Sequence, residues 1–449
     1  MSTGSQPPDR DPDDHDDGRP DPDRPDPTPF NPLTALHGLD LNDLFRMLQT
    51  PGPVNWEVAR QCAESIAAAD PMTGEPSVEP AIDASHLTEL EQLVRVAQTH
   101  VTAVSGLVEV SAVPVRVVGR IDWTRATLDG LKPVIESLSM ALTAGQPATF
   151  DPSAFDPAKF MGGLAEGAAD PDMLAGMIGA LAPLLFGVQA GSLVGLLAQH
   201  ALGQHDLPLP LAGPPQLAFV MSNIEAFAAD WEIEHRDLFL SLALREVVRC
   251  APRSVAWARA RLVRLSSDYV SRYEMRPDAL EERFGELFGD IPGLADFDLD
   301  SVDINDPSTF GNIPNIDIDP VKLLSGLQTP AQEPIRAELV RFASVLEGYA
   351  DTLVAELGTT LSPATGRVDE ALRRHRVEHG RHTEFVEQML GLAIDRTQYE
   401  AGAAFCQGVV ERAGFEGLNR LWERESMLPT ATEFEAPGLW LARIALDLD

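Results

Sequence analysis

Apolar residues recur at helical spacing along most of this chain, and strict alternation of apolar and polar residues is rare. One clear stripe runs from Leu87 to Val104 and a longer one from Gln332 to Leu357, with apolar side chains at every third or fourth position. Asp83 and Asp122 stand at the starts of segments 87–104 and 122–142, and we expect both to act as helix N-caps. These patterns predict a mainly α fold with little sheet.

Weaker sequence patterns predict further helices and one strand outside these two segments. Segment 234–265 is apolar on more than one face, which indicates a buried helix, and Pro252 is expected to break it. Gln216–Met221 is predicted as a short strand. Shorter helices are expected over three further segments, 42–48, 54–69 and 224–229.

The segment from Met173 to Gln204 has no Asp, Glu, Lys or Arg, and it carries glycines at four-residue spacing. Such a pattern is typical of a membrane helix with a small-residue face, or of a buried helix that packs closely on a neighbour. Pro183 and several polar residues interrupt it, and no aromatic belt or basic cluster flanks it. We therefore predict one or two buried helices packed through Gly187, Gly191 and Gly195. A membrane-associated scaffold is the alternative.

Composition and charge limit the classes of function. With 449 residues and 44% hydrophobic content, the chain can bury a large core. A formal net charge of -35 at pH 7 argues against nucleic acid as a partner, because phosphate binding depends on clustered Lys and Arg. Cys62, Cys250 and Cys406 are too few and too far apart for a disulfide framework, so we expect reduced core cysteines. The N-terminus has no apolar signal segment, which favours a cytoplasmic protein.

The chain divides into three predicted regions. Residues 1–30 are rich in Asp and Pro and poor in apolar residues, so we expect a disordered acidic tail. A helical N-terminal lobe is expected over 31–170. A second domain over 171–449 contains an acidic loop at 278–319, where Asp296 and its neighbours do not follow the calcium-binding EF-hand pattern.

The most informative local pattern is the sequence Arg-Glu-Val-Val-Arg at 245–249. A zinc-peptidase helix has His at two positions one turn apart, so that both imidazoles reach one ion, and the Glu after the first His acts as general base. Here Glu246 occupies the general-base position, but Arg245 and Arg249 occupy the two histidine positions. Guanidinium groups stay protonated and offer no lone pair to a metal. The pattern predicts a helix of the zinc-peptidase type without its metal.

Two further groups of residues are candidates for chemistry. Glu347 lies beside the apolar stripe of its helix, so we expect it to be partly buried and paired with a cation from the Arg-Glu-Val-Val-Arg helix. His375, His379 and His382 are spaced so that one helical face could carry all three and bind a metal. The arginines among these histidines favour an exposed basic segment instead.

Three stretches of sequence resemble a known family. They are Leu207–Arg249, the sequence LEGYAD at Leu346–Asp351, and Tyr399–Thr430. Together they are similar to a family of bacterial zincin-like proteins, usually labelled hydrolases or zinc-dependent metalloproteases. The resemblance covers roughly the C-terminal half and implies a zincin-like helical metallopeptidase domain. In the metal-binding branch of this family zinc is the cofactor, with His at the positions of Arg245 and Arg249 and, by resemblance, a carboxylate ligand at the position of Glu347.

The resemblance and the two arginines together predict a catalytically inactive member of that family, a pseudoenzyme. Glu246 would be a vestigial general base, and Arg245, Arg249 and Glu347 would mark the former metal positions, with no metal bound. We expect such a protein to hold a peptide or a partner protein in the old cleft. The alternative is an active zinc-dependent hydrolase whose ligands lie elsewhere in the chain.

Overall fold

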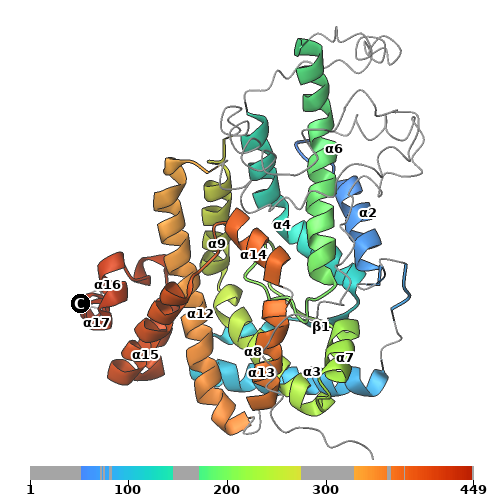
Figure 1. Ribbon diagram of the computed structural model, residues 1–449. Coiled ribbons are helices and arrows are strands. Elements are labelled where there is room, and N and C mark those ends of the chain that lie inside the picture. Colours follow the sequence, from blue (N-terminus) through green and yellow to red (C-terminus); the bar gives the residue numbers. More distant parts are fainter. Residues whose placement is uncertain are drawn as a thin grey trace, which may run out of the picture.

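The computed structural model describes residues 52–70, 73, 76–79, 83–144, 171–274, 328–361, 366–378 and 380–446. Helices dominate this part of the chain, which confirms the mainly α prediction (Figure 1). They are α2 (Trp56–Ala67), α3 (Ala84–Ser105), α4 (Arg120–Thr143), α6 (Pro171–Ala198), α7 (Met221–Asp230), α8 (His235–Ser254), α9 (Ala256–Val270), α12 (Glu333–Leu361), α13 (Gly366–Glu378), α14 (Gly380–Met389), α15 (Arg396–Asn419), α16 (Ala431–Glu435) and α17 (Pro437–Leu446). Two short strands, β1 (Val115–Val118) and β2 (Leu217–Val220), accompany them.

The first two of these helices begin where local capping predicts. The side chain of Asn55 accepts a hydrogen bond from the N–H of Val58 at 3.1 Å, at the start of α2. At the start of α3, Asp83 accepts one from the N–H of Ser85 at 2.7 Å. These bonds satisfy backbone donors that have no partner inside the helix, and the N-cap predicted at Asp83 is confirmed.

Helix α4 begins differently, and the N-cap predicted at Asp122 is wrong. The N-cap residue is Gly119, and Asp122 lies in the first turn, where it pairs with Arg125 at 3.2 Å. The carboxylate of Glu79 accepts a hydrogen bond from the N–H of Arg120 at 2.7 Å. A side chain distant in sequence therefore satisfies the first turn, which local sequence does not reveal.

Helix α6 packs against α2 through its glycines. A Cβ atom added at Gly187 or Gly191 would collide with the carbonyl oxygens of Asn55 and Ala59, and one at Gly195 would collide with the side chain of Ile66. The prediction of a buried helix packed through glycine is confirmed, and the absence of a side chain is what lets the two backbones approach. None of the helices in the described ranges is long and apolar enough to cross a membrane.

The two strands form a small parallel sheet in which Val115 pairs with Leu217 and Val118 with Val220. The strand predicted at 216–221 is confirmed, whereas β1 was not predicted. On the other side of β2, the N–H of Val220 donates to the carbonyl of Leu202 at 3.0 Å. This pairing helps to hold the segment that follows α6, in which the N–H of His205 donates to Glu246 of α8.

Helices α8 and α9 form the long apolar segment predicted over 234–265, but the break between them is not at Pro252. Pro252 lies within the last turn of α8, and Val255 separates the two helices with an extended backbone at φ -72° and ψ 120°. A proline near the C-terminus of a helix disrupts only the final turn, so the chain continues helical for two more residues.

Helices α12 and α15 pack closely at a pair of glycines. A Cβ atom at Gly348 would collide with the backbone of Gly402, and one at Gly402 would collide with the carbonyl of Ser344. Helix α12 also packs on α8 and α9, so it joins the C-terminal helices to the helix that carries Arg245. The three predicted core cysteines, Cys62, Cys250 and Cys406, are buried and free.

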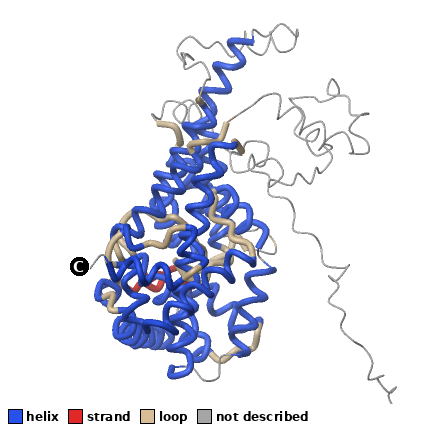
Figure 2. Tube along the Cα trace, turned by 90° about the vertical axis from the view of Figure 1, so that its left-hand side faces the viewer, coloured by secondary structure: helices blue, strands red, loops and turns tan. Residues whose placement is uncertain are grey.

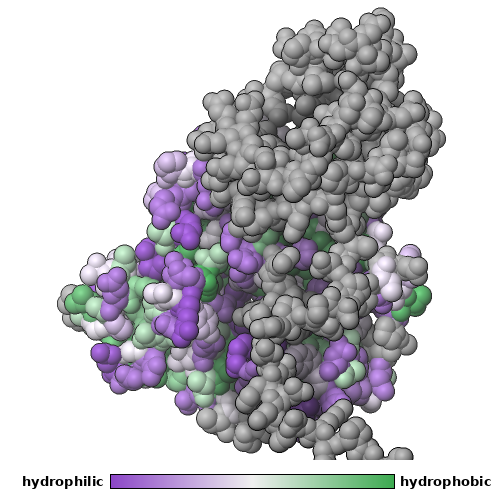
Figure 3. All heavy atoms as spheres, viewed as in Figure 1, coloured by the Kyte–Doolittle hydropathy of each residue, from purple (hydrophilic) through white to green (hydrophobic). Residues whose placement is uncertain are grey.

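One hydrophobic core joins residues from both sides of position 170, including Val94, Trp123, Leu242, Tyr349 and Phe405. Figure 2 shows the helices surrounding the short strands. Most of the coloured surface in Figure 3 is hydrophilic, with smaller apolar patches between the polar ones. The predicted tail 1–30, the helix 42–48 and the acidic loop 278–319 lie outside the described residues, and the division of the chain at 170 stays a prediction.

Candidate functional site

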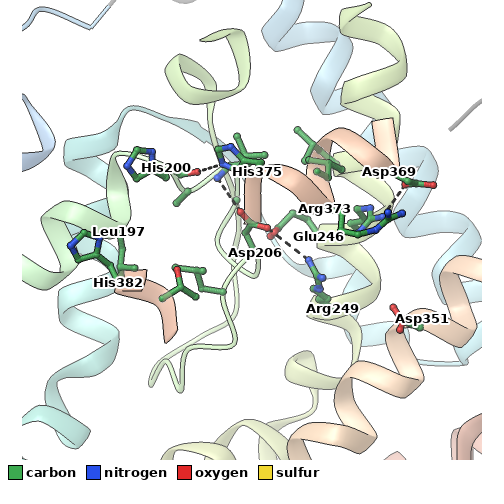
Figure 4. A pocket seen from close by; sticks show the side chains of 18 of the residues that line it. Leu197, His200, Asp206, Glu246, Arg249, Asp351, Asp369, Arg373, His375 and His382 are labelled. Carbon is green, nitrogen blue, oxygen red and sulfur yellow. Dashed lines mark hydrogen bonds and ion pairs between the residues drawn. The ribbon is translucent and has the colours of Figure 1, made fainter. Parts of the chain in front are cut away.

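Helix α8 carries the Arg-Glu-Val-Val-Arg sequence to the edge of a cleft of about 470 Å³. Arg245, Glu246 and Arg249 line one wall, and the segment that follows α6 lines the opposite wall (Figure 4). Helices α13 and α14 also contribute residues to the lining. The lining is mixed, because leucines from α6, α8 and α13 lie among acidic and basic side chains from α8, α12, α13 and the segment after α6.

The second arginine of the sequence, Arg249, is held by carboxylates. Its Nε lies 3.7 Å from Glu347 Oε2, and its Nη1 lies 4.0 Å from Asp206 Oδ1. The side chains of Arg249 and Glu347 are only 10% and 14% exposed. Burial acts to lower the pKa of Arg249, but Glu347 and Asp206 outweigh it and raise the pKa, so the guanidinium is a fixed positive charge. The predicted burial and pairing of Glu347 are confirmed.

A third arginine shares Glu347, which the sequence did not reveal. Arg253 Nη2 lies 3.7 Å from Glu347 Oε1, and Arg253 Nη1 donates to the carbonyl of Arg249 at 2.8 Å. Burial lowers the pKa of Arg253, although Glu347 acts against this shift. One buried carboxylate therefore lies between two buried guanidinium groups from successive turns of α8. The sequence signal was the third arginine one turn further along the same helix.

Arg245 does not pair with Glu347, although both were predicted, with Arg249, to mark the former metal positions. Its Nη2 donates to Asp369 Oδ1 of α13 at 2.8 Å. The side chains of Arg245 and Asp369 are 29% and 39% exposed, so this ion pair lies at the mouth of the cleft. The physical reason is that helix α13 packs against α8 and brings Asp369 within hydrogen-bonding distance of Arg245.

Glu246 lines the cleft, but its carboxylate is buried and held by the backbone. Its two carboxylate oxygens accept the N–H of His205 at 2.9 and 3.2 Å, and the residue is only 3% exposed. A Cβ atom at Gly203 would collide with the Glu246 carboxyl, so this close approach needs glycine. Burial raises the pKa of Glu246 to about 8. Glu246, which the sequence predicted as a vestigial general base, is thus a buried carboxyl group held by the backbone.

A second acid in the cleft was missed by the sequence hypothesis, although it lies in the LEGYAD sequence. Asp351 lines the cleft, and the Tyr399 hydroxyl donates to its carboxylate. Burial raises the pKa of Asp351, whereas the hydrogen bond from Tyr399 lowers it. Asp351 lies one turn after Glu347 on α12, so the acidic face of α12 contributes both carboxylates to this region.

Three histidines also line the cleft. His375 and His382, which were predicted on one helical face, lie on separate helices, α13 and α14, and His379 lies outside the described residues. His375 Nε2 lies 3.0 Å from the carbonyl oxygen of His200, and its ring packs edge-on against Phe227 at 5.2 Å between centroids. Both described histidines line the same cleft, and the predicted three-histidine face stays a prediction because it includes His379.

The zinc ion of a zincin site does not fit the residues at its expected positions. Arg245 and Arg249 are permanent cations with donors only, and both are already paired with carboxylates. Glu246 is bound by the N–H of His205, and Glu347 by two arginines. A divalent ion here would face like charge on two sides, so we derive no chemical step through a metal at this place.

The buried side chains of Glu246 and His205 affect the pH dependence of the free energy of unfolding in opposite directions. Burial lowers the pKa of His205 from 6.5 to about 3, so the unfolded chain binds a proton below pH 6.5 that the native protein does not. Glu246, with its pKa raised from 4.5 to about 8, keeps a proton that the unfolded chain has already released above pH 4.5. The two effects oppose each other between pH 4.5 and 6.5. Between pH 6.5 and about 8 only Glu246 acts.

We therefore expect the free energy of unfolding to fall as the pH rises from 6.5 to 8, by up to about 1.4 kcal/mol per pH unit. Glu246→Gln should remove this fall, because the amide has no proton to release and can still accept the His205 N–H. Urea unfolding of both proteins across this pH range measures the two slopes. Equal slopes would show that Glu246 is not the group that titrates.

Together, the mainly helical fold and the cleft beside α8 define a zincin-like protein with a substituted metal motif. The sequence profile of zincin-like metallopeptidases matches residues 54–441, and the chain therefore belongs to that family. Among solved structures, it is similar to a provisionally assigned hydrolase with a novel fold from Chloroflexus aurantiacus. The TM-score is 0.50 and the identity 20%, over 87% of this chain and 99% of that one, which shows a shared fold. No curated protein sequence matches the chain.

Proposed function

We propose that this protein is a catalytically inactive zincin-like metallopeptidase that binds a peptide segment in the cleft beside α8. The observation that carries the proposal is the state of the two histidine positions of the motif. Arg245 and Arg249 occupy them, and each forms an ion pair within the protein. Glu246 is buried and accepts the N–H of His205, and without imidazole ligands at 245 and 249 the motif has no zinc-bound water for it to activate.

The cleft itself supports binding. Its volume of about 470 Å³ is in the range of cavities that hold small molecules or short peptide segments. Leu197, Leu242 and Leu372 offer apolar contacts, while the partly exposed pair of Arg245 and Asp369 offers a donor and an acceptor at the mouth. A peptide needs both, because its backbone must keep hydrogen bonds while its side chains leave water.

Two measurements on the full-length protein test the proposal. The first asks for hydrolysis of a mixed pool of fluorogenic peptides, with and without added zinc, and we expect none. The second selects binders from a random displayed-peptide library. We expect enriched peptides to bind the wild type at least about 10-fold more tightly than Leu372→Glu, which places a charge in the cleft wall.

The matched control is Leu439→Glu, which adds the same charge on α17 at a side chain that is 54% exposed and does not line the cleft. It should bind the selected peptides as the wild type does. Peptide hydrolysis that a chelator abolishes would replace the proposal with an active zinc hydrolase. A library that yields no peptide sensitive to Leu372→Glu would overturn peptide binding in this cleft.

A further inference from the structure

Two histidines and a glutamate meet on the surface formed by α3, α7 and α8, away from the cleft. His86 Nδ1 lies 2.6 Å from Glu225 Oε1, and His235 Nε2 lies 2.7 Å from Glu225 Oε2. One donor atom from each of the three lies within 4.8 Å of the others. Figure 1 shows the three helices adjacent to one another in the lower part of the molecule. Among the described residues, no other group of His, Cys, Asp and Glu converges in this way.

The surrounding structure orients these side chains. The two imidazole rings stack with centroids 4.4 Å apart, and each packs edge-on against the buried ring of Phe239, at 5.6 and 5.7 Å. The side chains of His86, Glu225 and His235 are 27%, 29% and 38% exposed, so an ion can reach them from solvent. Rings held on one side and open on the other are suited to ligation, because little rotamer freedom remains to be lost.

The donor set suits a particular class of ion. Two neutral imidazoles and one carboxylate are borderline-soft nitrogen and oxygen ligands, which zinc and its neighbours among the divalent transition metals prefer. At metal–ligand distances of about 2.0–2.2 Å, tetrahedral ligand atoms lie about 3.4 Å apart. The present contacts to Glu225 are shorter than this by less than an ångström, and small rotations of three half-exposed side chains would open them.

Charge near the site favours a cation. Arg236, the residue after His235, is paired with Glu89 of α3 at 3.3 Å, so its positive charge is compensated. Asp83, the N-cap of α3, interacts electrostatically with His86. With neutral imidazoles, the three ligands carry one negative charge, and one divalent ion would leave the assembly with a single positive charge in an acidic protein.

We propose that His86, Glu225 and His235 bind one divalent transition-metal ion of the zinc class, with the remaining coordination position open to water. This site is separate from the cleft, since His235 begins α8 and lies ten residues before Arg245, about 15 Å along the helix axis. The ion would link α3 to α7 and α8, which lie more than 100 residues further along the chain. It would also hold the first turn of α8, the helix that carries Arg245.

The test uses full-length protein stripped with a chelator and titrated with zinc by calorimetry. We expect one zinc per chain with a Kd in the micromolar range or tighter, and a rise of at least about 2 °C in the midpoint of thermal unfolding at saturating zinc. Cobalt provides a spectroscopic probe, since ligation by these residues should produce visible absorption bands that zinc then removes. If the protein takes up no zinc, or if zinc does not remove the cobalt bands, the proposal is wrong. His86, Glu225 and His235 would then serve only to hydrogen-bond the three helices together.

Two variants assign the site. Glu225→Gln and His235→Gln each remove one ligand and should weaken zinc binding by about 100-fold or more, since loss of even an outer-shell partner typically costs 10–100-fold. His100→Gln is the matched control, because it changes a partly exposed histidine on the same helix as His86. Zinc uptake that persists in both ligand variants would overturn the assignment. The cobalt bands of the wild type decide the matter if a variant fails to fold.

Discussion

Replacing Glu347 by alanine is expected to lower the free energy of unfolding by about 3–5 kcal/mol. Glu347 lies between two buried guanidinium groups, at 3.7 Å from Arg249 and 3.7 Å from Arg253, and both arginines are at most 10% exposed. Without the carboxylate, Arg249 keeps its longer pair with Asp206, and Arg253 loses its ion pair, with no other found for it among the described residues. Two buried cations would then face each other. Denaturant unfolding followed by circular dichroism measures the loss.

Two further variants distinguish the effect of the uncompensated buried charges from the effect of losing a glutamate side chain. Glu356→Ala removes the same side chain from an exposed position on α12 and should change the stability by no more than about 0.5 kcal/mol. Replacing Arg249, Arg253 and Glu347 together by methionine should recover most of the stability, because the buried cluster then holds no uncompensated charge and Asp206, which loses Arg249, is partly exposed. Equal effects of Glu347→Ala and Glu356→Ala would contradict the electrostatic account.

The double substitution Arg245→His with Arg249→His is expected to create a zinc site at the two histidine positions of the motif. The two imidazoles would lie one helical turn apart, and Glu347 already lies beside position 249. Removing both guanidinium groups also removes the positive charge that opposes an ion. We expect uptake of one zinc per chain with micromolar or tighter affinity, measured by competition with a chromophoric chelator.

This measurement is made in the Glu225→Gln background, so that the proposed surface site does not contribute zinc. Adding Glu347→Ala to the double variant should abolish the new uptake, whereas adding Glu356→Ala should leave it unchanged. If the double variant takes up no zinc, positions 245, 249 and 347 do not form a former metal site. In that case the arginines are structural and the comparison with zinc peptidases ends at the fold.

The helices were predictable because their signals are local. The stripe at 87–104 and the cap at Asp83 depend on residues within one or two turns, and both agree with α3. The glycines of α6 also carried a readable signal, since small residues at four-residue spacing indicate close helix packing. The signals that failed depended on distant partners. Glu79 caps α4 from another segment, and β1 is stabilised by pairing with β2 far along the chain.

For the candidate site too, local sequence features were predictable and contacts between distant segments were not. The sequence was sufficient to identify the helix of Arg245 and Arg249 and to expect a buried, paired Glu347. It could not show that Arg245 turns to Asp369 while Arg253 shares Glu347, because the relative position of α12 and α13 around α8 is set by packing. The triad of His86, Glu225 and His235 was equally hidden, since its members are separated by up to 149 residues in the chain.

The chemical identity of the motif was determined by sequence alone, because a guanidinium group cannot become a metal ligand in any fold. Tertiary structure decided which carboxylate neutralises each guanidinium group. It also decided the burial that raises the pKa of Glu246. Pairing and desolvation depend on which segments meet in space. The sequence gives the type of each residue. The partners of each charged group, and how far it is removed from water, are set when α6, α8, α12 and α13 pack together.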